Sequence, residues 1–473
     1  MASNLVREGG KHVGSIWAVN MEQLDGIKDE IERCTKGLRS KAAGSTCCIY
    51  KVPSKYKDNN IGHWYRPRIV SIGPYYYNGR ELYSDYKYQC LGSFLSRAKG
   101  VTLADCMKKL HPLETKTRQC YSAEIEIDLS SEEFLEMMLL DASFILELFY
   151  KFQDLGMLET HDPLALLLRW RLPYFYVDLL LLQNQIPFLV LQELFDISKM
   201  PNDPSKATLP LLALRFFNNI LRRPNKVIER YANPENPPLH LLDLVRSSLI
   251  PNDPTASKDE DTQIQFCPFE IRLRVIDQMP LQDNTQIQSI PCISNLRSSG
   301  IRVRPGKAEA DSFLAVKFEN GLIEMPSIII NDFMRYLLLN CVAFEQCHKS
   351  CSNHVTAYAT LLDCLVNTSA DVKYLREHIV IDNYLADDRE VALFINSLGK
   401  DVTFDTRDCY LSKLFNDVDK YYRNSRHVYF ASFRRTYFNT PWWFIPAFAA
   451  ILLLLLTIVQ TFFSIISYVR PNN

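Results

Sequence analysis

The chain has 473 residues, of which 47% are hydrophobic and 23% are charged, and its formal net charge is −1. This composition is typical of a globular protein with a large core. The near-neutral charge argues against a nucleic-acid partner, because nucleic-acid-binding domains carry a concentrated basic face. With only 16 glycines, the chain also lacks the glycine-rich motifs that bind phosphates.

Residues 1–48 are expected to form an N-terminal arm with one amphipathic helix. The first twenty residues lack the apolar core and the cleavage site of a secretory signal. The thirteen cysteines are odd in number and irregularly spaced, which favours a reducing compartment. Apolar residues then recur near a/d spacing with charges between them, and we expect this helix to pack on the body. They are Trp17, Leu24, Ile27, Ile31, Cys34 and Leu38.

Residues 49–440 are expected to form one mainly helical domain. Ser130 and Glu133 have the spacing of a capping box and predict the start of a helix. A second apolar helix is predicted over residues 174–195. The stretch 198–262 is rich in proline and polar residues, and we interpret it as a variable connection with helical pieces near 211–221 and 239–249. The apolar face of the first helix consists of Phe134, Met137, Met138, Phe144, Ile145, Leu148 and Phe149.

A small antiparallel β element is predicted next. Three runs that follow the connection are apolar or alternating, and Glu319-Asn320-Gly321 between the last two is a hairpin signal. The runs cover residues 301–304, 313–318 and 322–330. Further helices are predicted over residues 332–348, 355–366, 370–378, 389–398 and 410–438.

The C-terminal stretch predicts a membrane anchor. From Trp442 to Tyr468 no residue is charged. A helix of this length covers about 40 Å, more than the roughly 30 Å of bilayer hydrocarbon. Residues 441–468 are therefore predicted to be a transmembrane helix, followed by a short tail at 469–473; a buried core helix is the alternative. The predicted fold class is mainly α, a helical body with a small antiparallel β element plus one C-terminal transmembrane helix.

The charges around this helix predict its orientation. Five basic residues precede it and Arg470 alone follows, so the positive-inside rule places the body in the cytosol. We expect a single-pass protein of the plasma membrane or an endomembrane. The sequon at Asn367 would matter only if the topology were reversed. The preceding basic residues are Lys420, Arg423, Arg426, Arg434 and Arg435.

A polar stripe runs along the predicted transmembrane helix. Its members are spaced so that they share one side of the helix. In hydrocarbon such a stripe favours a helix–helix interface, so we expect self-association or pairing with another membrane helix. The alternative is local bonding of serine and threonine hydroxyls to carbonyls four residues back. The members are Thr457, Gln460, Thr461, Ser464 and Ser467.

Asp141 and Glu345 are acids within apolar helices. An isolated buried carboxylate is very costly, so each should be paired. One interpretation is a structural ion pair, with Arg118 as the candidate partner of Asp141. The other is a general acid or base with a shifted pKa.

The stretch from Asp178 to Pro187 combines an apolar run with three amides, Gln183, Asn184 and Gln185. Pro187 has no N–H and conflicts with the carbonyl four residues earlier. The amides could bond the backbone groups freed by a kink, which is the structural interpretation. A ligand site at the broken helix is the alternative.

Motifs for metal binding and catalysis are weak. Cys347, Cys351 and His354 share one helical face, with His348 beside them, and three soft ligands could begin a zinc site. No second cluster supplies a clear fourth ligand, so we expect neither a metal nor a cofactor. The pattern SxxK at residues 84–87 and the pattern HxxxD at 378–382 occur without the partner motifs of their enzyme families.

The ordered motifs of this chain resemble the plant family called domain of unknown function 247. Two motifs differ: the family usually shows GPYHHG where this chain has GPYYYN from Gly73, and LENQ where it has LQNQ from Leu182. The missing histidines and acid weaken the case for a shared metal or acid–base site. The matching motifs are IYKVP (49–53), YRPRIVSIGPYYYNG (65–79), RQCY (118–121), EFLEMMLLDASFILEL (133–148), DLLLLQNQIPFLVL (178–191), LLDLVR (241–246), NCVAFEQC (340–347), DVKYLR (371–376) and FNTPWWFIPAFAAILLLLLTIVQT (438–461).

The resemblance implies a C-terminally anchored plant membrane protein without established enzymatic activity. Some grass members are implicated in pollen self-incompatibility, as recognition determinants. The first function hypothesis is therefore a membrane-anchored protein-interaction, signalling or recognition module. The second is a membrane-bound hydrolase or transferase. Its site would be Asp141, Asp178, Asn184, Gln185 and Glu345, which should then converge at a cleft instead of being satisfied separately within the core.

Overall fold

The fold was analysed in a computed structural model of the chain. The N-terminal arm, the second half of the predicted 410–438 helix and most of the C-terminal tail lie outside the described residues. The described residues are 46–53, 62–77, 84–122, 127–154, 163–199, 207–234, 236–251, 290–306, 312–348, 350–400, 402, 404–407, 409–423 and 444–469.

Helix α7 (Ser131–Asp154) is the centre of the N-terminal half of the body. It contacts α4, α5, α9 and α10, and its predicted apolar face is buried. The predicted capping box is confirmed, because Ser130 N–H donates to Glu133 Oε2 (2.9 Å) and Glu133 N–H donates to Ser130 Oγ (3.2 Å). The other elements here are η1 (Gly62–Tyr65), η2 (Pro74–Tyr76), α4 (Ser84–Arg97), α5 (Leu103–Leu110), η3 (His111–Leu113), α6 (Glu114–Gln119), α8 (Pro163–Asp178) and α9 (Phe188–Ser198).

The predicted continuous helix over residues 174–195 is wrong. The chain leaves helical geometry after Asp178, passes through turns over residues 179–187, and starts α9 with Pro187 as its N-cap. Proline suits the start of a helix because its missing N–H would have no partner there. The apolar residues Leu179 to Leu182 are nevertheless buried, so the turn lies inside the core.

The described part of the stretch 198–262 contributes to the core and contains the predicted helical pieces. Its helices are α10 (Leu209–Leu221), α11 (Asn225–Arg230) and α12 (Leu241–Ser247). Phe216 of α10 packs on Phe149 of α7, with ring centroids 5.2 Å apart. Two of its prolines stand at helix starts: Pro210 lies in the first turn of α10, and Pro224 is the N-cap of α11.

The predicted hairpin is confirmed. β2 (Lys317–Glu319) and β3 (Leu322–Met325) pair antiparallel around Asn320 and Gly321, whose φ angles are 50° and 76°. The other two strand pairs are parallel, so only the hairpin matches the antiparallel expectation. β1 (Arg302–Pro305) pairs with β3, and β4 (Ile328–Ile330) pairs with β5 (Ile381–Asn383). These strands lie beside the helices of the C-terminal half.

Helix α15 (Asp332–Cys347) joins the two halves of the body. It contacts α8 and α12 on one side and α16 and α18 on the other. Asn331 accepts a hydrogen bond from Met334 N–H at its start, as an N-cap should. Helices α16 (His354–Leu365), α17 (Ser369–Glu377) and α18 (Asp388–Leu398) agree closely with the predicted ranges. Helix α19 (Ser412–Arg423) matches the described part of the predicted 410–438 helix, and α14 (Ile293–Ser298) was not predicted.

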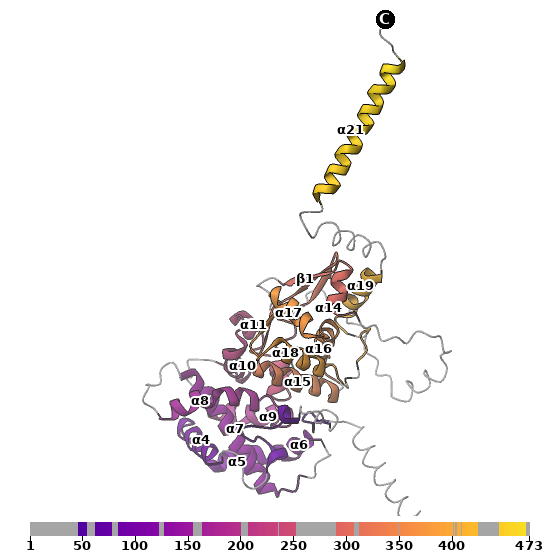
Figure 1. The fold of residues 1–473 in the computed structure, drawn as a ribbon. Coiled ribbons are helices and arrows are strands. Elements are labelled where there is room, and N and C mark those ends of the chain that lie inside the picture. The colour runs from indigo at the N-terminus through magenta and orange to yellow at the C-terminus, as the bar shows by residue number, and fades with distance from the viewer. Residues whose placement is uncertain are drawn as a thin grey trace, which may run out of the picture.

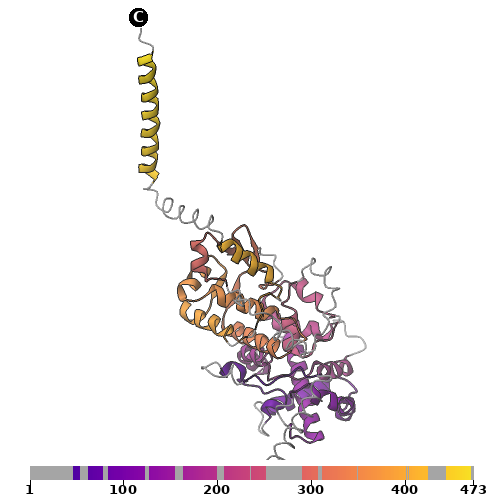
Figure 2. The same ribbon diagram turned by 90° about the vertical axis from the view of Figure 1, so that its right-hand side faces the viewer.

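Helix α21 (Phe444–Val469) stands apart from the body (Figures 1 and 2). Its window Phe448–Ile466 has 19 residues and a mean hydropathy of 2.5, and none of it is buried. Helix α21 is thus long enough and apolar enough to cross a membrane. It is not a core helix of this body. In both views α4, α5 and α7 lie at the end of the body far from α21.

Candidate functional site

Asp141 is fully buried on α7 and forms an ion pair with Lys87 of α4. The Lys87 Nζ lies 2.5 Å from Asp141 Oδ1 and also donates to the Ser71 carbonyl at 2.7 Å. The prediction that Arg118 is the partner of Asp141 is wrong, because Arg118 forms its ion pair with Glu114, at 2.9 Å. Burial raises the pKa of Asp141, and the Lys87 ammonium opposes this rise. The nearest cation in space comes from the SxxK pattern, which the sequence alone did not connect with Asp141.

The Asp141 carboxylate also accepts from the Gly73 N–H at 2.7 Å. Gly73 ends a segment without regular secondary structure, residues 68–73, in which Val70 and Ile72 are buried. Its φ of 72° and the Gln185 carbonyl, 2.5 Å from where a Cβ would lie, both require glycine at this position. The segment therefore enters the core without the partner strand that would satisfy its backbone.

Side chains take the place of that partner strand. Asp178 accepts from the N–H groups of Arg68 (2.8 Å), Ile69 (2.8 Å) and Val70 (3.0 Å). Asn184 accepts from Ile72 N–H (2.7 Å) and donates to the carbonyls of Val70 (3.0 Å) and Asp178 (2.9 Å). With Lys87 and Asp141, these residues satisfy the buried main chain of the 68–73 segment, as buried polar groups require.

Gln185 satisfies the turn itself. Its amide nitrogen donates to the carbonyls of Leu179 (2.7 Å) and Leu181 (3.0 Å), and its oxygen accepts from Leu242 N–H at 3.3 Å. Two of the three amides, Asn184 and Gln185, therefore bond freed backbone groups, as the structural interpretation of this stretch proposed, whereas the Gln183 oxygen has no partner. They do so around a full turn and not around a kinked helix.

Glu345 lies in a different polar cluster. It accepts from Val355 N–H (3.2 Å) and Thr356 N–H (2.7 Å), which caps the start of α16. Its other contact is with Arg246 (3.3 Å), which also pairs with Asp243 at 3.1 Å. Burial raises the pKa of Glu345, and Arg246 opposes this rise. Four of the five candidate residues thus lie around the 68–73 segment, and the fifth, Glu345, caps a helix elsewhere. Each of the five side chains forms its hydrogen bonds with groups inside the core.

The cysteine and histidine cluster does not converge. His348 contacts the Tyr50 hydroxyl (2.9 Å) and the Ser350 hydroxyl (2.8 Å), whereas His354 stacks on Tyr410 with ring centroids 4.5 Å apart. Cys351 donates to the His348 carbonyl at 3.1 Å. Among the described residues no three such side chains are grouped as metal ligands would be.

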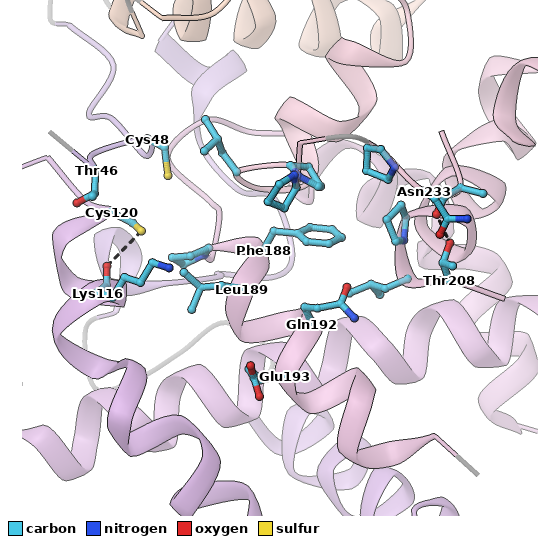
Figure 3. A pocket seen from close by; sticks show the side chains of 18 of the residues that line it. Thr46, Cys48, Lys116, Cys120, Phe188, Leu189, Gln192, Glu193, Thr208 and Asn233 are labelled. Atoms are coloured by element: carbon cyan, nitrogen blue, oxygen red, sulfur yellow. Dashed lines mark hydrogen bonds between the residues drawn. The ribbon is translucent and has the colours of Figure 1, made fainter. Parts of the chain in front are cut away.

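A pocket of about 740 Å³ opens between α6, α9 and α10 (Figure 3). This volume is in the range of about 300–1,000 Å³ that ligand pockets occupy. Its walls are mostly apolar, and the polar residues at its edge include Lys116, Gln192 and Glu193. None of the five candidate residues lines it. Five prolines do, namely Pro187, Pro210, Pro234, Pro237 and Pro238.

The prolines were the one feature of the sequence that pointed to this pocket, but we had interpreted them as part of a variable connection. The prolines at 234, 237 and 238 made residues 198–262 resemble a connection. In the structure these three prolines line the pocket together with Phe188 and Leu189 of α9. A wall made of prolines loses little conformational entropy when a ligand binds, because the φ angle of each proline is already fixed.

The burial of Asp178 predicts that the stability of the fold depends on pH. Burial raises its pKa to about 6, although three backbone N–H groups lower it; an unfolded aspartate has a pKa of about 3.9. Since the folded pKa is the higher one, the contribution to stability is complete below about pH 4 and is lost as the pH rises through about 6. We expect this group to remove about 2–3 kcal/mol of unfolding free energy between pH 4 and pH 6.

Urea titration of the full chain in detergent micelles at both pH values would measure this change. Asp178→Asn cannot titrate, so the difference between its two unfolding free energies should lack this component. An identical pH dependence in both proteins would contradict the prediction.

Comparisons with known proteins agree with one another. A family model described as "Plant protein of unknown function", DUF247, matches residues 49–456. The chain is 32% identical over 441 residues to UPF0481 protein At3g47200 of Arabidopsis thaliana, covering 92% of this chain and 90% of that relative. It is 24% identical over 491 residues to the Putative UPF0481 protein At3g02645 of the same plant, covering 88% and 90%. No solved structure matches the chain.

Proposed function

This chain belongs to the DUF247 family of plant proteins, and we propose that it is a membrane-anchored interaction protein. Helix α21 spans a bilayer, and the body binds a protein partner through the proline-lined pocket. The role is recognition or signalling and not catalysis.

The exposed apolar surface of α21 carries this proposal. Every residue of the window Phe448–Ile466 lies outside the core, although the mean hydropathy is 2.5. Leaving so much apolar area in water costs about 25 cal/mol per Å², and a bilayer removes that cost. The body has a core of its own that does not need this helix.

The orientation of the body follows from the basic residues that precede α21, and it can be tested with sealed microsomes. External protease should digest an N-terminal tag and spare a C-terminal one, because the basic residues favour the cytosolic side. Asn367 is exposed on the body, so it would be available to the glycosylation machinery if the body were lumenal. Glycosylation of Asn367 in the native protein, or protection of the N-terminal tag, would overturn the cytosolic orientation.

The pocket supports the binding half of the proposal. It offers an apolar cavity next to Lys116, an exposed cation. The matching partner segment inserts an apolar side chain and carries an acidic residue beside it. Interfaces of this kind take most of their energy from one buried anchor in a pocket.

Site-specific photo-crosslinking in plant membranes tests this binding. A photoreactive residue at Gln192, on the pocket edge, should give discrete crosslinked proteins. The matched control is Lys373, which is exposed on α17 nearer to α21 (Figure 1). The same products at both positions, or none at Gln192, would reject the pocket as the binding site.

The polar stripe of α21 bears on self-association. Thr457 donates to the Leu453 carbonyl and Thr461 to the Thr457 carbonyl, each at 2.7 Å, so local bonding satisfies both threonines. The Gln460 amide lies on the exposed surface between them. We therefore expect Gln460 to contribute most to any pairing of these helices.

In a membrane two-hybrid assay the isolated α21 span should give a signal that Gln460→Leu reduces. Interhelical bonds average only about 0.6 kcal/mol, so the reduction should be partial. Adding Thr457→Val should change little, because its hydroxyl bonds its own helix. No signal from the wild-type span, or full signal from Gln460→Leu plus Thr457→Val, would reject the stripe as an interface.

A further inference from the structure

Two cysteines lie side by side at one end of the pocket. The Cys120 carbonyl accepts from both Cys48 N–H and Ile49 N–H at 2.9 Å, and Ser122 N–H donates to the Ile49 carbonyl at 2.9 Å. These bonds form a parallel bridge between Ile49 and Tyr121. The register places Cys48 directly beside Cys120.

This register suits a disulfide. Neighbouring strands lie about 4.8 Å apart, and paired residues direct their side chains to the same face. Disulfides form when the Cα atoms are about 4.4–6.8 Å apart. The two thiols influence each other electrostatically, as neighbouring ionisable groups do.

The pocket gives both sulfurs a route to small molecules. Cys48 and Cys120 are only 2% and 5% exposed, yet both line the pocket. Figure 3 shows their sulfur atoms at the same end, next to Lys116. Cys120 Sγ also donates to the Lys116 carbonyl at 3.3 Å, which fixes its position.

The two thiols differ in acidity. The neighbouring Cys48 thiol lowers the pKa of Cys120, and the nearby Lys116 ammonium adds to this effect against the opposing effect of burial. The Cys120 thiol, together with burial, raises the pKa of Cys48. Cys120 is therefore the better nucleophile, since the thiolate is the attacking species.

We propose that Cys48 and Cys120 are a redox-active dithiol, which low-molecular-weight disulfides oxidise through the pocket. In the first step the Cys120 thiolate attacks glutathione disulfide, forms a mixed disulfide and releases one glutathione thiolate. In the second step Cys48 loses its proton and attacks the Cys120 sulfur, which releases the second glutathione thiolate and closes the Cys48–Cys120 bond. Two electrons pass from the two cysteines to the glutathione disulfide.

Oxidation changes the pocket as well as the sulfurs. The new bond ties the segment that contains Thr46 and Cys48 to the end of α6, and both line the pocket. It also removes two thiol groups from the wall. The redox proposal does not rest on the protein partner proposed above, because the isolated chain supplies both thiols and the open pocket.

The test uses the full chain in detergent micelles, equilibrated with graded ratios of reduced to oxidised glutathione. Mass spectrometry of the digested protein should find the Cys48–Cys120 peptide pair, which should disappear on reduction. Cys47→Ser is the matched control, because it removes the adjacent thiol and should leave the pair intact. Cys48→Ser should stop at a mixed disulfide of glutathione with Cys120, whereas Cys120→Ser should leave Cys48 unmodified.

Differential alkylation of the wild-type protein gives a measurement that needs no variant. Oxidation should protect Cys48 and Cys120 together, at the same glutathione ratio. The proposal is overturned if the Cys48–Cys120 pair is absent under fully oxidising conditions. It is also overturned if Cys47 replaces Cys48 in the bond, or if the two thiols lose alkylation at different ratios.

Discussion

Replacing Asp141 with alanine should lower the unfolding free energy of the body by about 3–5 kcal/mol, as removing one member of a buried ion pair does. Lys87 and Asp141 are both 0% exposed, so the lysine would remain as an uncompensated charge in the core. The Gly73 N–H would lose its acceptor at the same time. Urea or thermal denaturation of the full chain in detergent micelles would measure the loss.

A double variant separates a structural role from a functional one. Lys87→Met with Asp141→Leu removes both charges and keeps similar volume, and such replacements are often close to neutral. We expect it to recover most of the stability that Asp141→Ala loses. An unchanged midpoint for Asp141→Ala would contradict the structural role and favour an acid–base role for this residue.

Asn184→Leu should cost about 3 kcal/mol or more. The variant loses three hydrogen bonds to buried main-chain groups: the Ile72 N–H and the carbonyls of Val70 and Asp178. Each buried group left without a partner costs about 1–3 kcal/mol. The comparison with the wild type would again use equilibrium denaturation of the full chain.

The neighbouring Gln183 provides the control. It lies in the same turn and is only 4% exposed, but its amide oxygen has no hydrogen-bond partner. Gln183→Met keeps the volume and removes this unsatisfied oxygen, so stability should change by less than about 1 kcal/mol. Equal losses in both variants would show that the turn responds to any substitution and that the Asn184 bonds have no special weight.

The predictable parts of the fold are those with local causes. The capping box at Ser130 and the apolar periodicity of α15 to α18 placed helix starts within a few residues, because caps and spacing act within one or two turns. The hairpin at Gly321 was equally local. The parallel pairing of β4 with β5 was not, because its partner lies about fifty residues further along the chain.

The candidate site shows the same limit. Asp178, Asn184 and Gln185 stood out because polar residues interrupt an apolar run, and the structure does give them many bonds. Most of their partners are main-chain groups, those of residues 68–73 for Asp178 and Asn184 and those of three leucines for Gln185. Such partners leave no mark in the sequence, since backbone groups are the same for every residue type. The run Leu179 to Leu182 favours helix locally, and tertiary contacts override that preference.

The way the 68–73 segment is held also has a consequence for the order of folding. Apart from Lys87, the side chains that bond its main chain lie 68 to 114 residues later in the chain. During synthesis the segment therefore leaves the ribosome well before α7 and the 179–187 turn exist. Closing loops of that length costs entropy that only the completed contacts repay. We therefore expect the segment to dock after α7 and α8 have assembled, so that a part of the family domain made early reaches its native place late.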